Sequence, residues 1–104
     1  MTNTLAMIAI ALPLSGLEAR ALLRAIPDET NARTILAPAL RIPRDRTTRV
    51  DISPADATSL ATRLSELVAD PDRCLQLFQG KKFWMRSLFS ATFRLRQLLA
   101  HGRS

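Results

Sequence analysis

Cations and aromatic rings carry the most evident chemistry in this 104-residue sequence, and both gather at one end. Residues 80–104 hold six cations and no Asp or Glu, whereas residues 1–79 hold nine arginines and nine acids. The whole net charge of +6 therefore lies in the last quarter of the chain. All five aromatic residues lie in that quarter or just before it: Phe78, Phe83, Trp84, Phe89 and Phe93. This asymmetry predicts that the C-terminal end docks onto a partner, and the excess of cations favours an anionic one. The alternative is that the charge reflects coding bias, since thirteen of the fifteen basic residues are Arg.

Three of these cations lie where a helix is expected to begin. The pattern predicts a last helix from about Lys82 to Ala100, closed by His101 and Gly102, so that the cations Lys81, Lys82 and Arg86 fall at its start. Cations there oppose the helix dipole, and no Ser, Thr, Asp or Asn caps this end. An anion bound by the free backbone donors and the lysines would reverse that cost. The alternative is one continuous helix through Gly80, with no free start.

The same helix has a broad apolar arc. At 100° per residue, its large apolar side chains cover more than half of the circumference, and Arg96 lies among them. One interpretation is that this arc simply completes the core. The other is that its surplus forms an interface, with Trp84, Phe89 and Phe93 as anchors and Arg96 at the rim. Arg94 lies on the narrow polar face, where we expect it to help attract an acidic partner surface.

A second basic run lies in the middle of the chain. Arg41, Arg44, Arg46 and Arg49 occur within nine residues that contain only one acid. Arginines near a turn can grip the phosphates of a nucleic acid, although an ordinary solvated loop has the same composition. Residues 46–64 of this region, a strand with polar Thr47, Arg49 and Asp51 before a helix started by proline, resemble the first half of a ribbon-helix-helix DNA-binding protein.

That resemblance implies that the polar strand positions would enter the major groove of DNA from a symmetric dimer. It covers about a fifth of the chain. Asp51 departs from it because an acid would face phosphates, and the short turn and second helix of the family are not evident after Leu64. The resemblance therefore keeps DNA binding among the alternatives without assigning the family.

Catalytic and metal chemistry have little support in the sequence. His101 has no evident acid or nucleophile partner, and Cys74 beside Leu75 and Leu77 is typical of a small core residue. No cluster of His, Cys or paired carboxylates has metal-ligand spacing, and the three glycines are too scattered for a phosphate-cradling loop. We expect no enzyme activity, no metal and no cofactor.

The elements that must position these residues are predicted from local patterns. Large and small apolar residues alternate from Ile8 to Leu14, which predicts a strand. Ser15 and Glu18 form a capping box before a helix over 16–26, ended by Pro27. Residues 31–40 are left open between a short helix and an irregular strand. Leu40 and Ile42 are expected to pair with residues 48–52 in a hairpin turning at 43–46.

The cap pattern recurs 38 residues later. Ser53 and Pro54 start a helix over 54–68 after a strand that ends at Ile52, so the chain reads as two strand–cap–helix units. A duplication and a generic strand-to-helix turn both explain this likeness. Asp70 and Pro71 then start a further helix, expected to run to about Gln79 and stop at Gly80.

Together these patterns predict one α+β domain over residues 1–104, with a sheet of two to four strands packed by about four helices. Residues 1–79 form its charge-balanced part and residues 80–104 its basic aromatic helix. The expected function is a regulatory or accessory protein that docks on a larger protein or protein–nucleic acid assembly with an acidic surface. Direct binding of DNA or RNA is the alternative, ahead of a membrane surface, and homo-oligomers stay open. A single cysteine, and no cation before the apolar run of residues 5–12, favour the cytoplasm.

Overall fold

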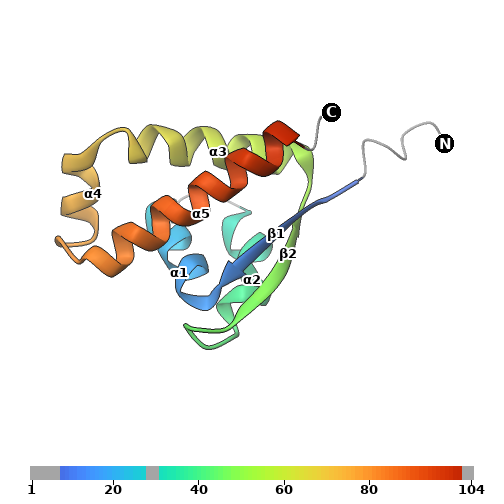
Figure 1. Ribbon diagram of the computed structural model, residues 1–104, viewed down its shortest axis with the longest axis horizontal. Coiled ribbons are helices and arrows are strands. Elements are labelled where there is room, and N and C mark those ends of the chain that lie inside the picture. The colour runs from blue at the N-terminus through green and yellow to red at the C-terminus, as the bar shows by residue number, and fades with distance from the viewer. Residues whose placement is uncertain (1–7, 28–30, 102–104) are drawn as a thin grey trace.

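The computed structural model describes residues 8–27 and 31–101, and it confirms the predicted small α+β domain. Five helices and a two-stranded antiparallel sheet make up these residues (Figure 1). In chain order the elements are β1 (Ile10–Ser15), α1 (Gly16–Ala25), α2 (Ala32–Leu40), β2 (Thr47–Ile52), α3 (Pro54–Val68), α4 (Pro71–Leu77) and α5 (Lys82–His101). Gly102, predicted to close the last helix, lies outside the described residues.

The sheet has one buried and one exposed face. Leu12 lies opposite Val50 in the register, and both are fully buried, as are Leu14 and Ile52. The alternate residues face solvent, because successive side chains of a strand point to opposite faces. The polar residues of β2 therefore lie outside, where Arg49 and Asp51 form an exposed ion pair of 3.3 Å.

The predicted caps explain where the helices begin. The Ser15 hydroxyl accepts a hydrogen bond from the Glu18 backbone N–H, and the Glu18 carboxylate accepts one from the Ser15 N–H, both at 2.9 Å. Ser53 accepts from the Asp56 N–H at 3.1 Å, and Asp70 accepts from the Arg73 N–H at 3.3 Å. Pro54 and Pro71 come next as first helical residues, where a missing N–H removes no bond.

Helix α5 packs across the molecule. It lies against α1, α3 and β1, and its inner face buries Leu88, Ala91, Thr92 and Leu95. Figure 1 shows α3 leading away from β2, α4 turning the chain, and α5 returning diagonally across the same side. Helices α3 and α5 therefore lie side by side, joined by α4, and α5 covers β1 and α1.

In the middle of the chain, one prediction is wrong and one open alternative is decided in favour of the short helix. The hairpin of Leu40 and Ile42 with residues 48–52 is wrong, because Leu40 ends α2 and β2 pairs with β1. Pairing with β1 places all four large strand residues on one buried face, which a hairpin through the polar loop 43–46 would not do. Residues 32–40 are helical despite Pro38, whose side chain is exposed.

The likeness between the two strand–cap–helix units has a structural counterpart. Their strands are the two partners of the sheet, and each leads directly into a helix capped by serine. The helices of the two units have different neighbours, since α1 packs on α5 and α2 whereas α3 packs on α5 and α4. Within residues 8–27 and 31–101, no helix combines the length and apolar character that crossing a membrane requires.

Candidate functional site

The rings of α5 separate into exposed and covered groups. Phe93 is 63% exposed and Phe89 is 44% exposed, and Phe83 is also open to solvent. Trp84 is half-buried and packs against the core. Trp84 and Phe93 are nine residues apart, which at 100° per residue puts them on opposite sides of the helix. The predicted anchors therefore do not share one surface.

Phe89, Phe93 and Arg96 do lie together, along the seam between α3 and α5. A hollow of about 290 Å³ is lined by these three residues with Val68 and Thr92. A second hollow, of about 500 Å³, is lined by Arg96 and Leu99 of α5 and by α3 residues: Thr58, Ala61, Thr62, Ser65 and Glu66. Arg96 belongs to both, so they adjoin. We call them together the α3–α5 groove.

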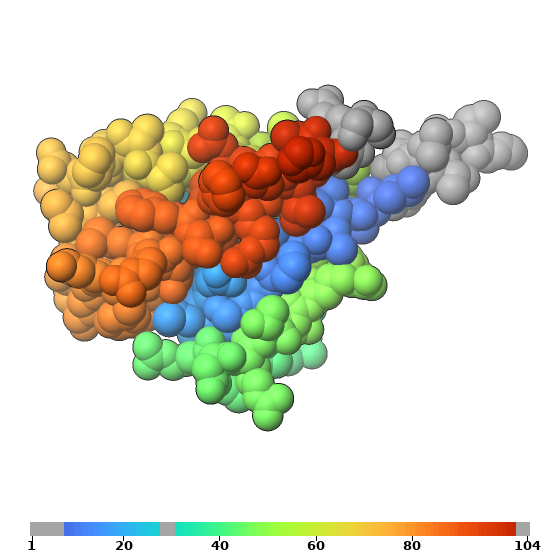
Figure 2. Space-filling model, viewed as in Figure 1, coloured from blue at the N-terminus to red at the C-terminus, as the bar shows by residue number. Residues whose placement is uncertain are grey.

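The two walls of the α3–α5 groove differ in chemistry for a reason visible in the sequence. The large apolar residues of α3, such as Leu60 and Leu64, point into the core. Small and hydroxyl-bearing residues of α3 are left to face the groove. The α5 wall instead carries Phe89 and Phe93, four residues apart on one face. In Figure 2 the orange and red atoms of α5 lie below yellow α3 and above blue β1.

One polar atom in the groove wall is unusual. Thr92 is only 2% exposed, and its hydroxyl oxygen finds no hydrogen-bond partner among the described residues. A buried hydroxyl without a partner costs about 1–3 kcal/mol. Thr92 is therefore a position where the packing between α3 and α5 is not optimal for stability, directly beside the exposed rings.

The start of α5 is a separate helix N-terminus, the first of the two arrangements considered for Lys81 and Lys82. Gln79 and Gly80 adopt positive φ angles of 54° and 73°, which break the chain between α4 and α5. The Gly80 N–H bonds back to the Leu75 carbonyl at 2.9 Å and ends α4. The alternative of one continuous helix is thus wrong. Both lysines and Arg86 are exposed.

Arg94 has a structural partner instead of a free surface position. Its Nη1 donates to Glu18 Oε1 at 3.0 Å and to the Pro13 carbonyl at 2.7 Å, and its Nη2 donates to Glu18 Oε2 at 3.1 Å. Burial raises the pKa of Glu18, but the hydrogen bonds and charge of Arg94 and the Ser15 N–H outweigh it, so the pKa lies below its usual value. Arg94 therefore holds α5 to the start of α1.

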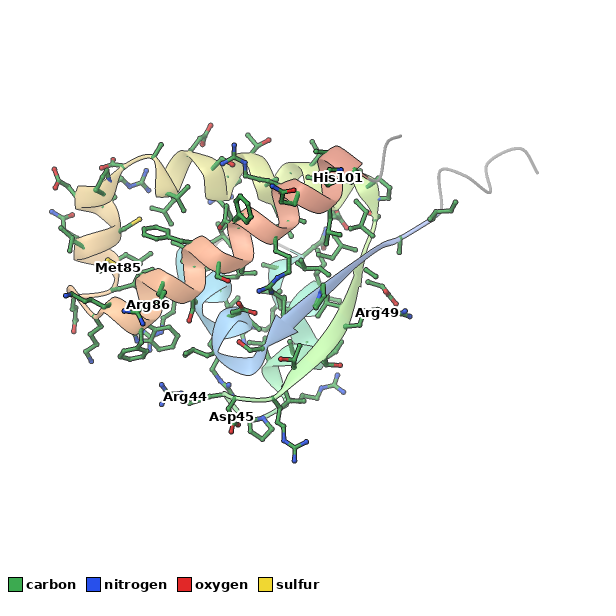
Figure 3. The ribbon with its side chains drawn as sticks, in the orientation of Figure 1. Arg44, Asp45, Arg49, Met85, Arg86 and His101 are labelled. Atoms are coloured by element: carbon green, nitrogen blue, oxygen red, sulfur yellow. The ribbon has the colours of Figure 1, made fainter. Side chains whose placement is uncertain are left out.

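The basic segment 41–49 is divided by the fold. The Arg44 guanidinium lies 5.4 Å from the centroid of the Phe83 ring, so the middle of the segment reaches the first turn of α5. Arg41 and Arg46 are exposed, and Arg49 lies farther along β2 with Asp51. Figure 3 shows Arg44 and Arg86 toward one end of the molecule and Arg49 on the opposite side. These four arginines do not form one surface.

His101 and Cys74, the two residues considered for catalysis, lie on different helices, α5 and α4. His101 is exposed, with its Nε2 3.1 Å from the Gln97 side-chain oxygen. Cys74 is buried, its Sγ lies 3.3 Å from the Leu67 carbonyl, and burial together with the Asp70 charge raises its pKa. No three His, Cys, Asp or Glu within residues 8–27 and 31–101 are grouped so as to hold a metal ion.

Sequence reasoning missed a second cationic site, made by residues from α1 and α2. Arg20, Arg24 and Arg33 line one hollow with Trp84. The spacing of Arg20 and Arg24, four residues apart on a predicted helix, was the available signal for the first two. The approach of Arg33 and Trp84 depends on tertiary packing.

Comparison of the chain with protein-family models, with curated proteins and with solved structures finds no match.

Proposed function

We propose that this protein is a non-enzymatic binding protein whose α3–α5 groove receives an amphipathic helix of a partner protein. The observation that carries the proposal is the pair of exposed rings on the groove, with Phe93 at 63% and Phe89 at 44% exposure. Full burial of a phenylalanine side chain contributes about 1.5–3 kcal/mol, so covering both rings would make them the natural anchors of a complex.

A helix fits the groove better than an extended segment. The groove runs between two long helices, and α3 alone contributes lining residues from Thr58 to Val68. At 1.5 Å rise per residue this corresponds to about 15 Å, or roughly three turns of a docked helix. Apolar residues at three- and four-residue spacing on that helix would meet the rings, while the small residues of α3 would allow close approach.

Charge specifies the partner further. Helix α5 carries Lys82, Arg86, Arg94 and Arg96 and no acid, and Arg96 has no ion pair among the described residues. Glu66 is the acid that lines the far part of the groove. An acidic residue of the partner placed against Arg96 would be favourable and would set the direction of the docked helix. This mode of binding supports a regulatory or accessory role on a larger assembly.

The test begins with site-specific crosslinking in cells. A photoreactive benzoylphenylalanine at position 93 should crosslink to a partner protein that the same residue at position 83 does not capture. Phe83 is a matched control because it is an exposed ring of the same helix outside the α3–α5 groove. Identical captures from both positions would contradict the proposal, as would capture of only a second copy of this chain or of lipid.

The identified partner then allows a quantitative test with purified proteins. We expect Phe93→Ala to raise the dissociation constant by tenfold or more, which corresponds to a loss of about 1.4 kcal/mol of binding free energy. Arg96→Gln should raise it less. Phe83→Ala should leave it unchanged. Circular dichroism and thermal unfolding establish that each variant is folded. An affinity unaffected by Phe93→Ala would reject the groove as the docking site.

A second candidate is binding of single-stranded nucleic acid, favoured by the contact between Arg44 and Phe83. A partly exposed ring beside arginine can stack on a base while neighbouring cations contact phosphates. Lys82 and Arg86 lie on the same and the adjoining turn of α5 as Phe83, and Lys81 directly precedes the helix. This candidate predicts anisotropy changes with a labelled oligonucleotide that weaken steeply with salt. They should be reduced by Phe83→Ala and left intact by Arg49→Gln. Absence of binding at low salt would reject it.

A further inference from the structure

A third hollow lies on the opposite side of α5 from the groove. It has a volume of about 390 Å³ and is lined by Arg20, Leu23, Arg24, Pro27, Arg33 and Trp84. The volume falls within the range of small-molecule sites in proteins, roughly 300–1,000 Å³. Half of its lining residues are arginines and none is an acid. We call it the arginine pocket.

The arginine pocket brings three like charges together. Arg20 and Arg24 lie four residues apart on one face of α1, and Arg33 comes from the first turn of α2. None of the three has an ion pair with a described residue. Like charges at this helical spacing are unfavourable by a few tenths of a kcal/mol. An anion between them would remove that repulsion.

Arg20 is held in place by backbone carbonyls at and just after the end of α2. Its Nη2 donates to the Ile42 carbonyl at 3.2 Å and more weakly to the Leu40 carbonyl at 3.5 Å. Its Nη1 is buried and has no partner among the described residues. This nitrogen lies against Gly16, where an added Cβ would be 2.8 Å from it, so the Arg20 guanidinium is fixed beside the hollow and contributes its positive charge to it.

The aromatic wall of the arginine pocket is rigid. Trp84 stacks on buried Phe78 with ring centroids 6.0 Å apart and planes inclined by 11°, and it contacts Phe83 at 5.3 Å. The Arg24 guanidinium lies 4.5 Å from the Trp84 ring centroid. Stacking restrains the guanidinium while leaving its edge donors available. Arg24 is thereby partly preorganised for a planar, bidentate contact.

We propose that the arginine pocket binds the phosphate group of a small phosphorylated molecule. Guanidinium groups match phosphate oxygens with paired hydrogen bonds, and a phosphate dianion offsets more of the surplus charge than a carboxylate does. Leu23 and Pro27 supply an apolar surface for the organic part of the molecule. The site is independent of the α3–α5 groove, because the two lie on opposite sides of α5.

The single tryptophan of the chain reports on this site directly, since the protein has no tyrosine and no other tryptophan. Titration of the full-length protein with ribose 5-phosphate should produce a saturable change in Trp84 fluorescence, whereas ribose should not. Sodium chloride at matched ionic strength controls for screening. Isothermal calorimetry on the same solutions gives a second readout that does not depend on the Arg24–Trp84 contact.

Two variants locate the binding. We expect Arg33→Gln to weaken ribose 5-phosphate binding at least tenfold, and Arg73→Gln, at an exposed position of α4 outside the pocket, to leave it unchanged. Each variant removes one positive charge, so the net charge of the two proteins is the same. The proposal would be overturned if neither ribose 5-phosphate nor inorganic pyrophosphate gave a saturable response. It would also be overturned if the two variants changed binding equally.

A further titration, with a single-stranded oligonucleotide, distinguishes a small phosphorylated molecule from the phosphates of a nucleic acid. A single-stranded oligonucleotide that binds while ribose 5-phosphate and pyrophosphate do not would overturn the small-molecule site in favour of nucleic-acid binding. An effect reproduced by sodium chloride alone would overturn it as well. Because Phe93 lies outside the arginine pocket, Phe93→Ala should bind ribose 5-phosphate normally. Failure of the groove proposal and failure of this one can thus be told apart.

Discussion

Glu18 and Arg94 form a two-pronged ion pair that joins the first turn of α1 to the middle of α5 across 76 residues of sequence. Both carboxylate oxygens accept from the guanidinium, at 3.0 and 3.1 Å, and the same carboxylate completes the capping box with Ser15. The Glu18 side chain is 13% exposed and that of Arg94 is 34% exposed. One acid therefore serves local helix initiation and long-range docking together.

Arg94 also protects a strand edge. Its 2.7 Å hydrogen bond to the Pro13 carbonyl occupies an acceptor of β1, and Pro13 has no N–H to offer. Unpaired strand edges invite pairing with other chains, so a proline and a guanidinium at this point reduce that risk. Arg94, which the sequence suggested as an attraction for an acidic partner, therefore also holds α5 to β1 and α1.

The Glu18–Arg94 pair should contribute measurably to stability. We expect Glu18→Gln to lower the free energy of unfolding by about 1–2 kcal/mol. This loss is smaller than that expected for a fully buried ion pair, because solvent screens the partly exposed Arg94. Gln can still serve the capping box, so the loss reports on the ion pair. Denaturant unfolding of this variant, Arg94→Gln and the double variant gives the coupling energy. Additive losses would show that the two side chains do not stabilise each other.

Stability should fall in acid because of the same residue. The folded-state pKa of Glu18 lies below its usual value of 4.5, so the unfolded chain binds its proton more readily. The contribution of the pair is complete above about pH 4.5 and is lost as the pH drops through the lower folded-state pKa. Unfolding curves from pH 7 downward should show a smaller acid-dependent loss for Glu18→Gln. Parallel pH profiles for the two proteins would contradict this assignment.

Gly16 should be intolerant of any side chain. A Cβ there would lie 2.7 Å from the Ile42 carbonyl oxygen and still closer to that of Pro43, both backbone atoms. We expect Gly16→Ala to destabilise by about 1–3 kcal/mol, because the 41–46 loop must move. Gly80→Ala is the comparison for this steric effect. Nothing lies within 4 Å of its new Cβ, so any loss of stability in that variant comes from the positive φ alone. Wild-type stability of Gly16→Ala would show that the loop yields freely.

Thr92 offers the opposite outcome, a stabilising substitution. Thr92→Val keeps the shape of the side chain and removes the buried hydroxyl that lacks a partner among the described residues. We expect the free energy of unfolding to rise by about 1 kcal/mol. Leu88→Ala, a cavity-forming change on the same buried face, should lower it by about 2–5 kcal/mol and calibrates the assay. A loss of stability in Thr92→Val would mean that the hydroxyl is satisfied.

Local signals in the sequence predicted local structure well. The caps at Ser15, Ser53 and Asp70, the prolines after two of them and the 3.6-residue periodicity located α1, α3 and α4 within one or two residues. The partner of β2 was predicted wrongly because alternation identifies a strand but not its neighbour. Pairing depends on which strands can bury the same face together, which is a property of the whole chain.

The gathering of six cations and most of the rings at one end is determined by the sequence alone, together with the α+β class. Only the tertiary structure decided how that set divides. Because α1 packs on α5, Arg94 forms an ion pair with Glu18. Trp84 packs against Phe78 and Arg24. Phe89, Phe93 and Arg96 line the α3–α5 groove. A helical wheel gives directions around one helix, but burial depends on the neighbours that occupy each direction. For that reason α5 contributes to three candidate surfaces, and its sequence alone does not show which residues belong to each.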